Sequence, residues 1–199
     1  MIEISSRDNP LLKTLRRLSQ DSTAYRKTGQ VWLEGDHLCQ AALTRGLRPL
    51  QAVFARSQWE QDGGRWHAVA QQAVVIPDAL FDGISQLESP ARMGFVIALP
   101  VAPVIDPRAP TVVLDRLQDA GNVGAILRSA SAFGLVQVLA MKGTAALWSP
   151  KVLRAGMGAH FGLRLHEGLS AQDVSALAVP ILTTSSHQGP FLHELVQSQ

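Results

Sequence analysis

The residues best suited to chemistry lie in one short segment near the middle of the chain, Asp119–Gly134. Two glycines, Gly121 and Gly124, stand on either side of Asn122, and Arg128 follows. Glycines allow a ligand to approach the backbone closely, an asparagine amide both donates and accepts hydrogen bonds, and an arginine binds phosphate. The segment therefore predicts a site for an anionic ligand at the start of a helix.

A strand and a helix must position these side chains. The β-branched run 111–115 predicts a buried strand, and residues 122–133 predict the helix that follows it. One side of this helix is apolar and carries Val123, Ile126, Leu127, Ala130 and Phe133. Arg128 points away from that side, on the face of Gly121 and Gly124, and is free to meet a ligand. The plainer interpretations, Asn122 as a helix cap and Arg128 as a surface arginine, stay open.

A second segment, 149–161, also combines a helix signal with unexpected glycines. Ser149 as N-cap and Pro150 at the first helical position predict a helix that runs toward Phe161. Gly156 and Gly158 would each cost this helix about 1 kcal/mol relative to alanine. We therefore expect another helix, a second subunit or a ligand to be pressed against the backbone here.

The chain divides near its middle. Four prolines lie within the eleven residues 100–110, and this composition predicts a stiff, extended linker. It separates a small α/β domain, residues 1–99, from a second α/β domain, residues 111–199. Strands and helices alternate in both halves, which favours an α/β fold with a mainly parallel sheet flanked by helices and right-handed crossovers.

The remaining predicted elements complete this alternation. In the first half they are a helix over 8–20, a strand over 31–35, a helix from Asp36 as N-cap to Arg45, a strand over 50–55, a helix over 58–72 and strands over 73–77 and 94–99. In the second half they are strands over 136–140, 162–166 and 179–184 and a helix over 170–177.

The amino-acid composition excludes several classes of protein. With 46% hydrophobic and 17% charged residues, the 199-residue chain is an ordinary globular protein, and no apolar run approaches the ~20 residues of a membrane span. The N-terminus lacks the features of a secretory signal. Cys39 is the only cysteine, which excludes an internal disulfide and fits the cytoplasm; we expect it to be a small buried residue rather than a nucleophile. The histidines show no metal-ligand spacing, so no metal site is predicted.

Positive charge gathers at the N-terminus, although the net charge is only +2. Clustered cations are typical of phosphate contact, so these side chains are candidates for binding nucleic acid. The alternative is a solvated helix face with Leu11, Leu12, Leu15 and Leu18 packed beneath it, and both can hold. The clustered cations are Arg7, Lys13, Arg16, Arg17, Arg26 and Lys27.

Taken together, the two central segments resemble the SpoU (TrmH-like) branch of the SPOUT RNA methyltransferases. Residues 119–130 resemble the first motif of that family, with Ala120 where a proline is usual. Residues 149–161 resemble the second motif, with Gly156 where a small hydroxyl residue is more usual. The N-terminal half resembles the small RNA-binding domain that often precedes the catalytic one. The residues that carry this resemblance are 6–13, Tyr25-Arg26 and 33–35.

The resemblance implies methyl transfer from S-adenosylmethionine to a ribose 2′-hydroxyl of ribosomal or transfer RNA, by a homodimer formed through the C-terminal domain. Arg128 would be the central catalytic residue and Asn122 would help to build the site. Because an arginine stays protonated, we expect Arg128 to grip an RNA phosphate and to orient or acidify the hydroxyl, rather than to act as a general base. The RNA-binding residues would be Arg7, Asn9, Lys13, Arg16, Arg17, Arg26, Lys27 and Arg154.

One departure from the family leaves alternatives open. The third motif, rich in glycine and asparagine, should begin shortly after Leu195, but the chain ends at Gln199. The resemblance then implies that the knot-forming segment and most of the adenosyl pocket are missing and that apolar surface is left bare, so no cofactor-binding residue is assigned. The chain would be either a truncated product of a longer protein or a non-catalytic RNA-binding protein. A nucleotide-binding α/β enzyme of another class has little support, because no Walker or dinucleotide motif is present.

Overall fold

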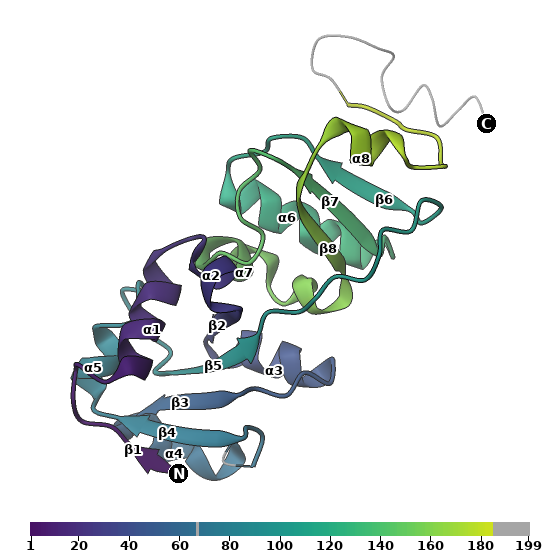
Figure 1. The fold of residues 1–199 in the computed structure, drawn as a ribbon. Coiled ribbons are helices and arrows are strands. Elements are labelled where there is room, and N and C mark those ends of the chain that lie inside the picture. Colours follow the sequence, from purple (N-terminus) through teal and green to yellow (C-terminus); the bar gives the residue numbers. More distant parts are fainter. Residues whose placement is uncertain (67, 185–199) are drawn as a thin grey trace.

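The computed structural model describes residues 1–66 and 68–184. Two sheets lie in separate halves of the molecule, and helices from both halves meet between them (Figure 1). We refer to residues 1–98 as the N-terminal unit and to residues 109–184 as the C-terminal unit. In the described part of the chain, no helix is long and apolar enough to cross a membrane.

The N-terminal unit is built on a mixed five-stranded sheet with the order β1-β4-β3-β5-β2. Strands β1, β4 and β3 are parallel, whereas β5 runs antiparallel to both of its neighbours. The strands are β1 (Ile2–Glu3), β2 (Gln30–Glu34), β3 (Gln51–Ala55), β4 (Gln72–Ile76) and β5 (Met93–Ala98). The helices are α1 (Pro10–Gln20), α2 (Ala24–Thr28), α3 (Asp36–Thr44), α4 (Arg56–Trp66) and α5 (Asp78–Asp82). The sequence did not predict β1, α2 and α5.

Helix α1 forms where the leucine pattern predicts it. Asn9 caps the helix by accepting a hydrogen bond from the backbone nitrogen of Leu11 at 2.9 Å, and Pro10 occupies the first turn. Leu12, Leu15 and Leu18 are buried. The leucine side of the basic N-terminal segment is therefore a packed face, as the alternative interpretation expected, and cations remain on the other side.

The start of α3 differs from the prediction. Its N-cap is Gly35, with φ of 99°, and Asp36 lies within the first turn. Glycine adopts this backbone conformation without the strain that a side chain would bring, so the chain turns sharply out of β2 at Gly35. The Asp36 carboxylate then lies at the positive end of the helix dipole.

The C-terminal unit contains three parallel strands in the order β6-β7-β8, which confirms the mainly parallel sheet predicted for this half. The strands are β6 (Thr111–Leu114), β7 (Gln137–Met141) and β8 (Arg164–Leu169). The helices are α6 (Ala120–Ala132), α7 (Pro150–Gly156), the 3-10 helix η1 (Ala159–Gly162) and α8 (Ala171–Ser175).

The segment between the units is extended and is fixed at its far end. Residues 99–106 contain no helix, strand or turn. The fully buried Gln137 of β7 accepts a hydrogen bond from the backbone nitrogen of Asp106 at 2.9 Å and donates one to its carbonyl at 3.0 Å. This pair of bonds holds the end of the linker against the C-terminal sheet.

Three predicted elements are wrong in whole or in part. The helix predicted over 58–72 is α4, which ends at Trp66, and Gln72 already belongs to β4. The helix expected to reach Phe161 ends at Gly156, because Met157 adopts a left-handed conformation with φ of 49° and Gly158 follows with φ of 87°. Gly158 therefore lies outside a helix. The strand predicted over 179–184 is not formed, and Ile181 and Leu182 are exposed. A strand requires a neighbour to pair its backbone groups, and the described part of the chain provides none there.

Candidate functional site

The start of α6 carries the residues singled out by the sequence. Asp119 is the N-cap, and its carboxylate accepts a hydrogen bond from the backbone nitrogen of Asn122 at 2.7 Å. The helix therefore begins two residues earlier than predicted, and Asn122 is not its cap. The Asn122 side chain is exposed and forms no hydrogen bond within the described residues, which leaves its amide available.

Gly124 serves helix packing rather than ligand approach, so this part of the prediction is wrong. A Cβ atom at this position would overlap Ala155 of α7 and lie 2.8 Å from the backbone nitrogen of Gly156. Gly156 and Gly158 have similar explanations. A Cβ at Gly156 would lie 2.8 Å from Nδ1 of His160, and one at Gly158 would lie 2.6 Å from Cβ of Ala41. Close packing within the chain accounts for all three glycines.

The apolar side of α6 is buried only in part. Val123, Leu127 and Ala130 are buried as predicted. Phe133, which the helical pattern placed on the same side, is 83% exposed. The helix ends at Ala132 and Phe133 is its C-cap, so the regular periodicity no longer determines where its ring points.

Arg128 is exposed and forms no ion pair or hydrogen bond within the described residues. It lines an open hollow of about 500 Å³ whose wall includes Gly156 and Gly158 and, from the end of α3, Arg45. Arg45 is also exposed, and its guanidinium lies over Gly162. Two arginines from different units thus line one hollow, an arrangement suited to a phosphate group. The sequence did not indicate Arg45, because 83 positions separate it from Arg128.

Arg154 lies in two further hollows at the N-terminal ends of α6 and α7. One, of about 630 Å³, extends toward α1, and the other, of about 680 Å³, extends toward Gly121. Asn122 lines neither of them, nor the hollow of Arg128. Asn122 and Arg128 therefore do not share any of these three hollows; along the helix they are about 9 Å apart.

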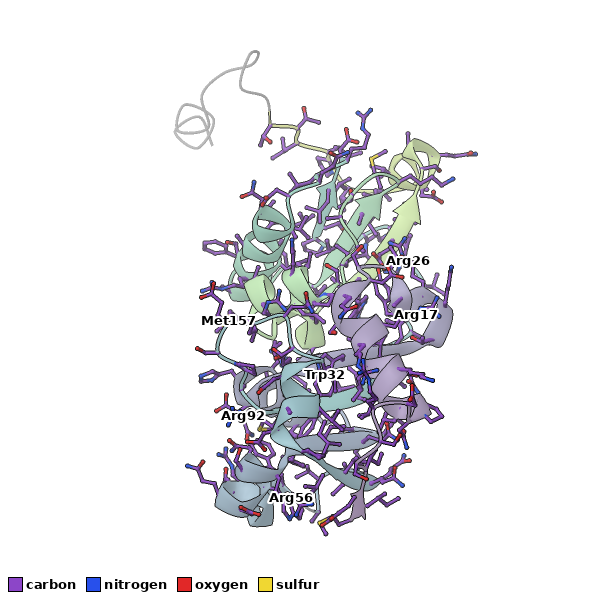
Figure 2. The ribbon with its side chains drawn as sticks, turned by 90° about the vertical axis from the view of Figure 1, so that its left-hand side faces the viewer. Arg17, Arg26, Trp32, Arg56, Arg92 and Met157 are labelled. Carbon is purple, nitrogen blue, oxygen red and sulfur yellow. The ribbon has the colours of Figure 1, made fainter. Side chains whose placement is uncertain are left out.

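The residues of the N-terminal unit that were predicted to bind RNA divide into two groups. Arg7, Arg17 and Lys27 are exposed and form no ion pair within the part that the structure describes. Figure 2 shows Arg17 and Arg26 on the same side of the molecule, near α1. The others have structural partners: Asn9 caps α1, Lys13 lies 3.4 Å from Asp8, Arg16 donates to the carbonyl of Arg7 at 2.9 Å, and Arg26 pairs with Glu167 at 3.0 Å.

Glu167 of β8 connects the two units, and no sequence pattern indicated it. The Tyr25 hydroxyl donates to this carboxylate, as do a guanidinium nitrogen of Arg26 and the backbone nitrogen of Leu147 at 2.8 Å. Burial, and then the Glu167 charge, raise the pKa of Tyr25 above its usual range. The cluster therefore remains a neutral phenol and a guanidinium around one carboxylate.

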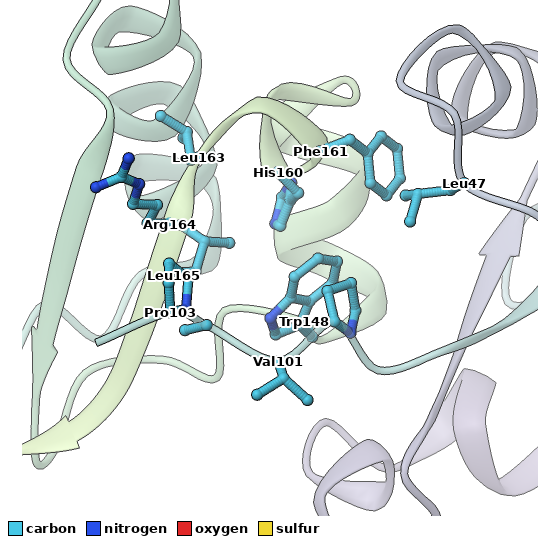
Figure 3. A pocket seen from close by; sticks show the side chains of 11 residues that line it. Leu47, Val101, Pro103, Trp148, His160, Phe161, Leu163, Arg164 and Leu165 are labelled. Atoms are coloured by element: carbon cyan, nitrogen blue, oxygen red, sulfur yellow. The ribbon is translucent and has the colours of Figure 1, made fainter. Parts of the chain in front are cut away.

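A small apolar hollow of about 110 Å³ lies between the linker and the C-terminal unit (Figure 3). Linker residues, including Val101 and Pro103, face Trp148 and His160 across it. His160 is buried, its Nε2 atom is 2.8 Å from the carbonyl of Leu147, and burial lowers its pKa to about 4. None of the predicted site residues lines this hollow, so we infer that it is a packing contact between the linker and the C-terminal unit.

Two further predictions can be compared with the structure. Cys39 is fully buried with its thiol 3.6 Å from the carbonyl of Leu33, and burial raises its pKa, which confirms a structural cysteine. Among the described residues, no group of three or more histidines, cysteines or carboxylates is placed to hold a metal ion.

Comparison with known families identifies the C-terminal unit. Residues 109–194 match the model of the SpoU rRNA Methylase family, and this range contains both central motifs. The C-terminal unit belongs to the SpoU family. We refer to it below as the SpoU unit.

Curated relatives extend the similarity toward the N-terminus. Mitochondrial rRNA methyltransferase 3 of Mus musculus is 32% identical over 164 residues, which cover 73% of this chain and 38% of that protein. The 23S rRNA (guanosine(2553)-2′-O)-methyltransferase RlmP of Bacillus subtilis is 25% identical over 203 residues, which cover 100% of this chain and 79% of the relative. The chain thus spans about two fifths of the length of the mitochondrial relative.

Solved structures of the same kind share the fold of both units. An AdoMet-bound rRNA methyltransferase from Sinorhizobium meliloti superimposes with a TM-score of 0.72 at 25% identity, over 87% of this chain and 67% of that one. An RNA 2′-O ribose methyltransferase gives a TM-score of 0.69 at 26% identity, over 87% and 68% of the two chains.

Proposed function

We propose that the protein carrying this chain is an RNA methyltransferase that transfers a methyl group from S-adenosylmethionine to a ribose 2′-hydroxyl of ribosomal or transfer RNA. One observation carries the proposal. Arg128, on the first motif of the SpoU unit, is exposed, has no ion pair among the described residues and shares its hollow with Arg45. The names of the relatives, rRNA methyltransferases and a 2′-O-methyltransferase among them, support the same chemistry.

Arg128 acts as a permanently charged cation in this proposal. A guanidinium does not lose its proton at ordinary pH, so Arg128 is no general base. It grips the phosphate next to the reacting ribose, and its charge stabilises the hydroxyl as negative charge develops on the oxygen. Arg45 holds the same segment of backbone from the N-terminal unit. Holding the ribose in line with the methyl donor supplies much of the acceleration.

Asn122 has a supporting role in this proposal. Its amide is free at the exposed start of α6, where it can hydrogen-bond to RNA that crosses the helix end. The exposed cations of the N-terminal unit, Arg7, Arg17 and Lys27, bind RNA phosphates at a distance from the reaction. Lys13, Arg16 and Arg26 keep spare hydrogen-bond donors for the same purpose.

S-adenosylmethionine supplies the electrophilic methyl group. The described residues do not form a complete pocket for it: the hollow beside Arg128 is open, and its lining contains two arginines but no carboxylate for the ammonium group of the methionine moiety. We therefore assign no cofactor-binding residue among them. The contribution of the described residues is to bind and orient the RNA.

We further propose that the SpoU unit forms a homodimer and that the protein is cytoplasmic. The exposed side of α6 carries small residues beside Phe133, namely Ala125, Ser129 and Ala132. They line a shallow hollow, with Arg128 at its edge, where a second copy can pack next to the proposed site. The cytoplasmic location rests on the single, buried cysteine.

The function is tested by methyl transfer to RNA. The full-length protein is incubated with S-adenosylmethionine bearing a deuterated methyl group and with total rRNA or tRNA, which is then digested to nucleosides for mass spectrometry. We expect the label on ribose, in a 2′-O-methyl nucleoside. Label on a base would overturn the assignment to ribose, and RNA binding without transfer would support the non-catalytic alternative.

A further inference from the structure

A polar hollow between the two units, distinct from the one beside Arg128, has the chemistry of a nucleotide-binding site. It measures about 630 Å³ and lies between the end of α1 and the start of α7. The N-terminal unit contributes Gln20 and Gln86 to its lining, and the SpoU unit contributes Gln118, Lys151 and Arg154.

The charge of this hollow is one-sided. Lys151 and Arg154 line it, and no carboxylate does. Neither cation forms an ion pair within the described residues. They lie three positions apart on α7, so they occupy the same side of that helix. Two unpaired cations without a competing carboxylate are an electrostatic match for the phosphates of a nucleic acid strand.

The neutral side chains that line the hollow also suit a nucleotide. Three glutamines converge on the hollow, Gln20 and Gln86 from the N-terminal unit and Gln118 from the SpoU unit. Gln20 and Gln118 form no side-chain hydrogen bond within the described part, and Gln86 forms one long contact, 3.4 Å, to the carbonyl of Ser85. A glutamine amide offers a donor and an acceptor side by side, which suits the edge of an unpaired base.

This hollow adjoins a second hollow at the N-terminal ends of α6 and α7. It shares Gln118, Ala120, Lys151 and Arg154 with the hollow that extends to Gly121 and Ala155. The hollow of Arg128 begins at the next residue of α7, Gly156. An RNA strand that runs along α7 from its N-terminal end would therefore meet Lys151 and Arg154 first and the hollow of Arg45 and Arg128 farther on.

We propose that the hollow between α1 and α7 binds one unpaired nucleotide of the RNA substrate, at a position flanking the methylated ribose. Gln20, Gln86 and Gln118 read its base, and Lys151 and Arg154 hold its phosphates. The inference rests on the proposed function for the identity of the ligand. It adds a specificity site that requires both units, because the glutamines come from each of them.

The test measures the binding of fluorescein-labelled RNA decamers, oligo(A), oligo(C) and oligo(U), to the full-length protein by fluorescence anisotropy. We expect the triple variant Gln20→Ala, Gln86→Ala, Gln118→Ala to bind its preferred decamer roughly tenfold more weakly and to lose the preference among decamers. Lys151→Ala should weaken all three decamers alike and lower the salt dependence by about one phosphate contact. The matched controls, Gln61→Ala on α4 and Lys142→Ala after β7, are exposed substitutions outside the hollow and should bind as the wild type does.

Wild-type binding of the decamers by the glutamine variant would overturn the inference, and so would a wild-type protein that binds none of them. The outcomes for the two proposals are separable. Glutamine-dependent binding without methyl transfer would contradict the proposed function alone. Methyl transfer to RNA whose binding ignores the three glutamines would contradict the nucleotide site alone.

Discussion

The hydroxyl of Tyr25 lies 2.7 Å from both carboxylate oxygens of Glu167, across the junction between the N-terminal unit and the SpoU unit. Tyr25 is buried beside α1, and Glu167 lies on β8, 142 positions later in the chain. The same carboxylate also holds Arg26 and the backbone of Leu147. This junction sets the position of the N-terminal cations and of Arg45 relative to Arg128.

Removing the Tyr25 hydroxyl should weaken the junction. Tyr25→Phe keeps the ring but deletes a hydrogen bond to a charged acceptor, so we expect the free energy of unfolding to fall by about 1.5–3 kcal/mol. Urea unfolding followed by circular dichroism measures the change. Asp115→Asn, an exposed carboxylate paired with Arg116, is the control and should leave stability unchanged. Equal stability of Tyr25→Phe and the wild type would show that the hydrogen bond from the Tyr25 hydroxyl contributes nothing to stability.

The close contact of α6 and α7 predicts a second sensitivity. In Gly124→Ala the new methyl group would overlap Ala155, so the helices must separate, at a cost of about 1–3 kcal/mol. Gly64→Ala is the matched control, because a Cβ there meets no atom within 4 Å and alanine favours the α4 helix. We expect thermal unfolding at a lower temperature for the first variant and at the same or a higher temperature for the second. A Gly124→Ala protein as stable as Gly64→Ala would refute the packing role.

These contacts also show where sequence reasoning succeeded and why it stopped. The strand 111–115 and the body of the following helix were predictable because β-branched residues and the apolar periodicity are local signals, whereas the cap at Asp119 was not recognised. Gly124 was visible as a small residue, but only the neighbouring helix decides whether it admits a ligand. The strand over 179–184 failed because pairing depends on a partner elsewhere in the chain. Glu167 and Arg45 were missed because their significance lies in contacts across the junction.

Burial of His160 predicts a pH dependence of stability. Its pKa is lowered to about 4, below its ordinary value of 6.5, so the unfolded chain binds the proton first as the pH falls. The stability that His160 contributes is complete above pH 6.5 and is lost progressively toward pH 4, up to ~3 kcal/mol. Free energies of unfolding measured from pH 7 to pH 4 should fall less steeply for His160→Gln than for the wild type. His37→Gln, at an exposed position, should keep the wild-type slope; parallel slopes for all three proteins would exclude His160 as the cause.

Arg45 should behave as a phosphate contact. Arg45→Ala is expected to weaken RNA binding for every sequence tested and to reduce the salt slope by about one contact. Arg48→Ala, three residues farther on, removes the same charge from an exposed position outside the hollow. RNA affinities measured at roughly 50 to 200 mM salt, a range over which phosphate contacts weaken, should distinguish the two variants. If Arg48→Ala lowers the salt slope as much as Arg45→Ala does, the loss of RNA affinity comes from the net charge of the protein and not from a phosphate contact in the hollow.

The most direct test of the central claim is the rate of methyl transfer by Arg128→Ala in a single turnover at saturating RNA. The claim is that this guanidinium stabilises the reacting hydroxyl, so the rate should fall by about 100-fold or more while RNA affinity changes only a few-fold. Arg108→Ala, an exposed arginine in the linker, should transfer at the wild-type rate. Transfer by Arg128→Ala at the same rate as Arg108→Ala would contradict the claim.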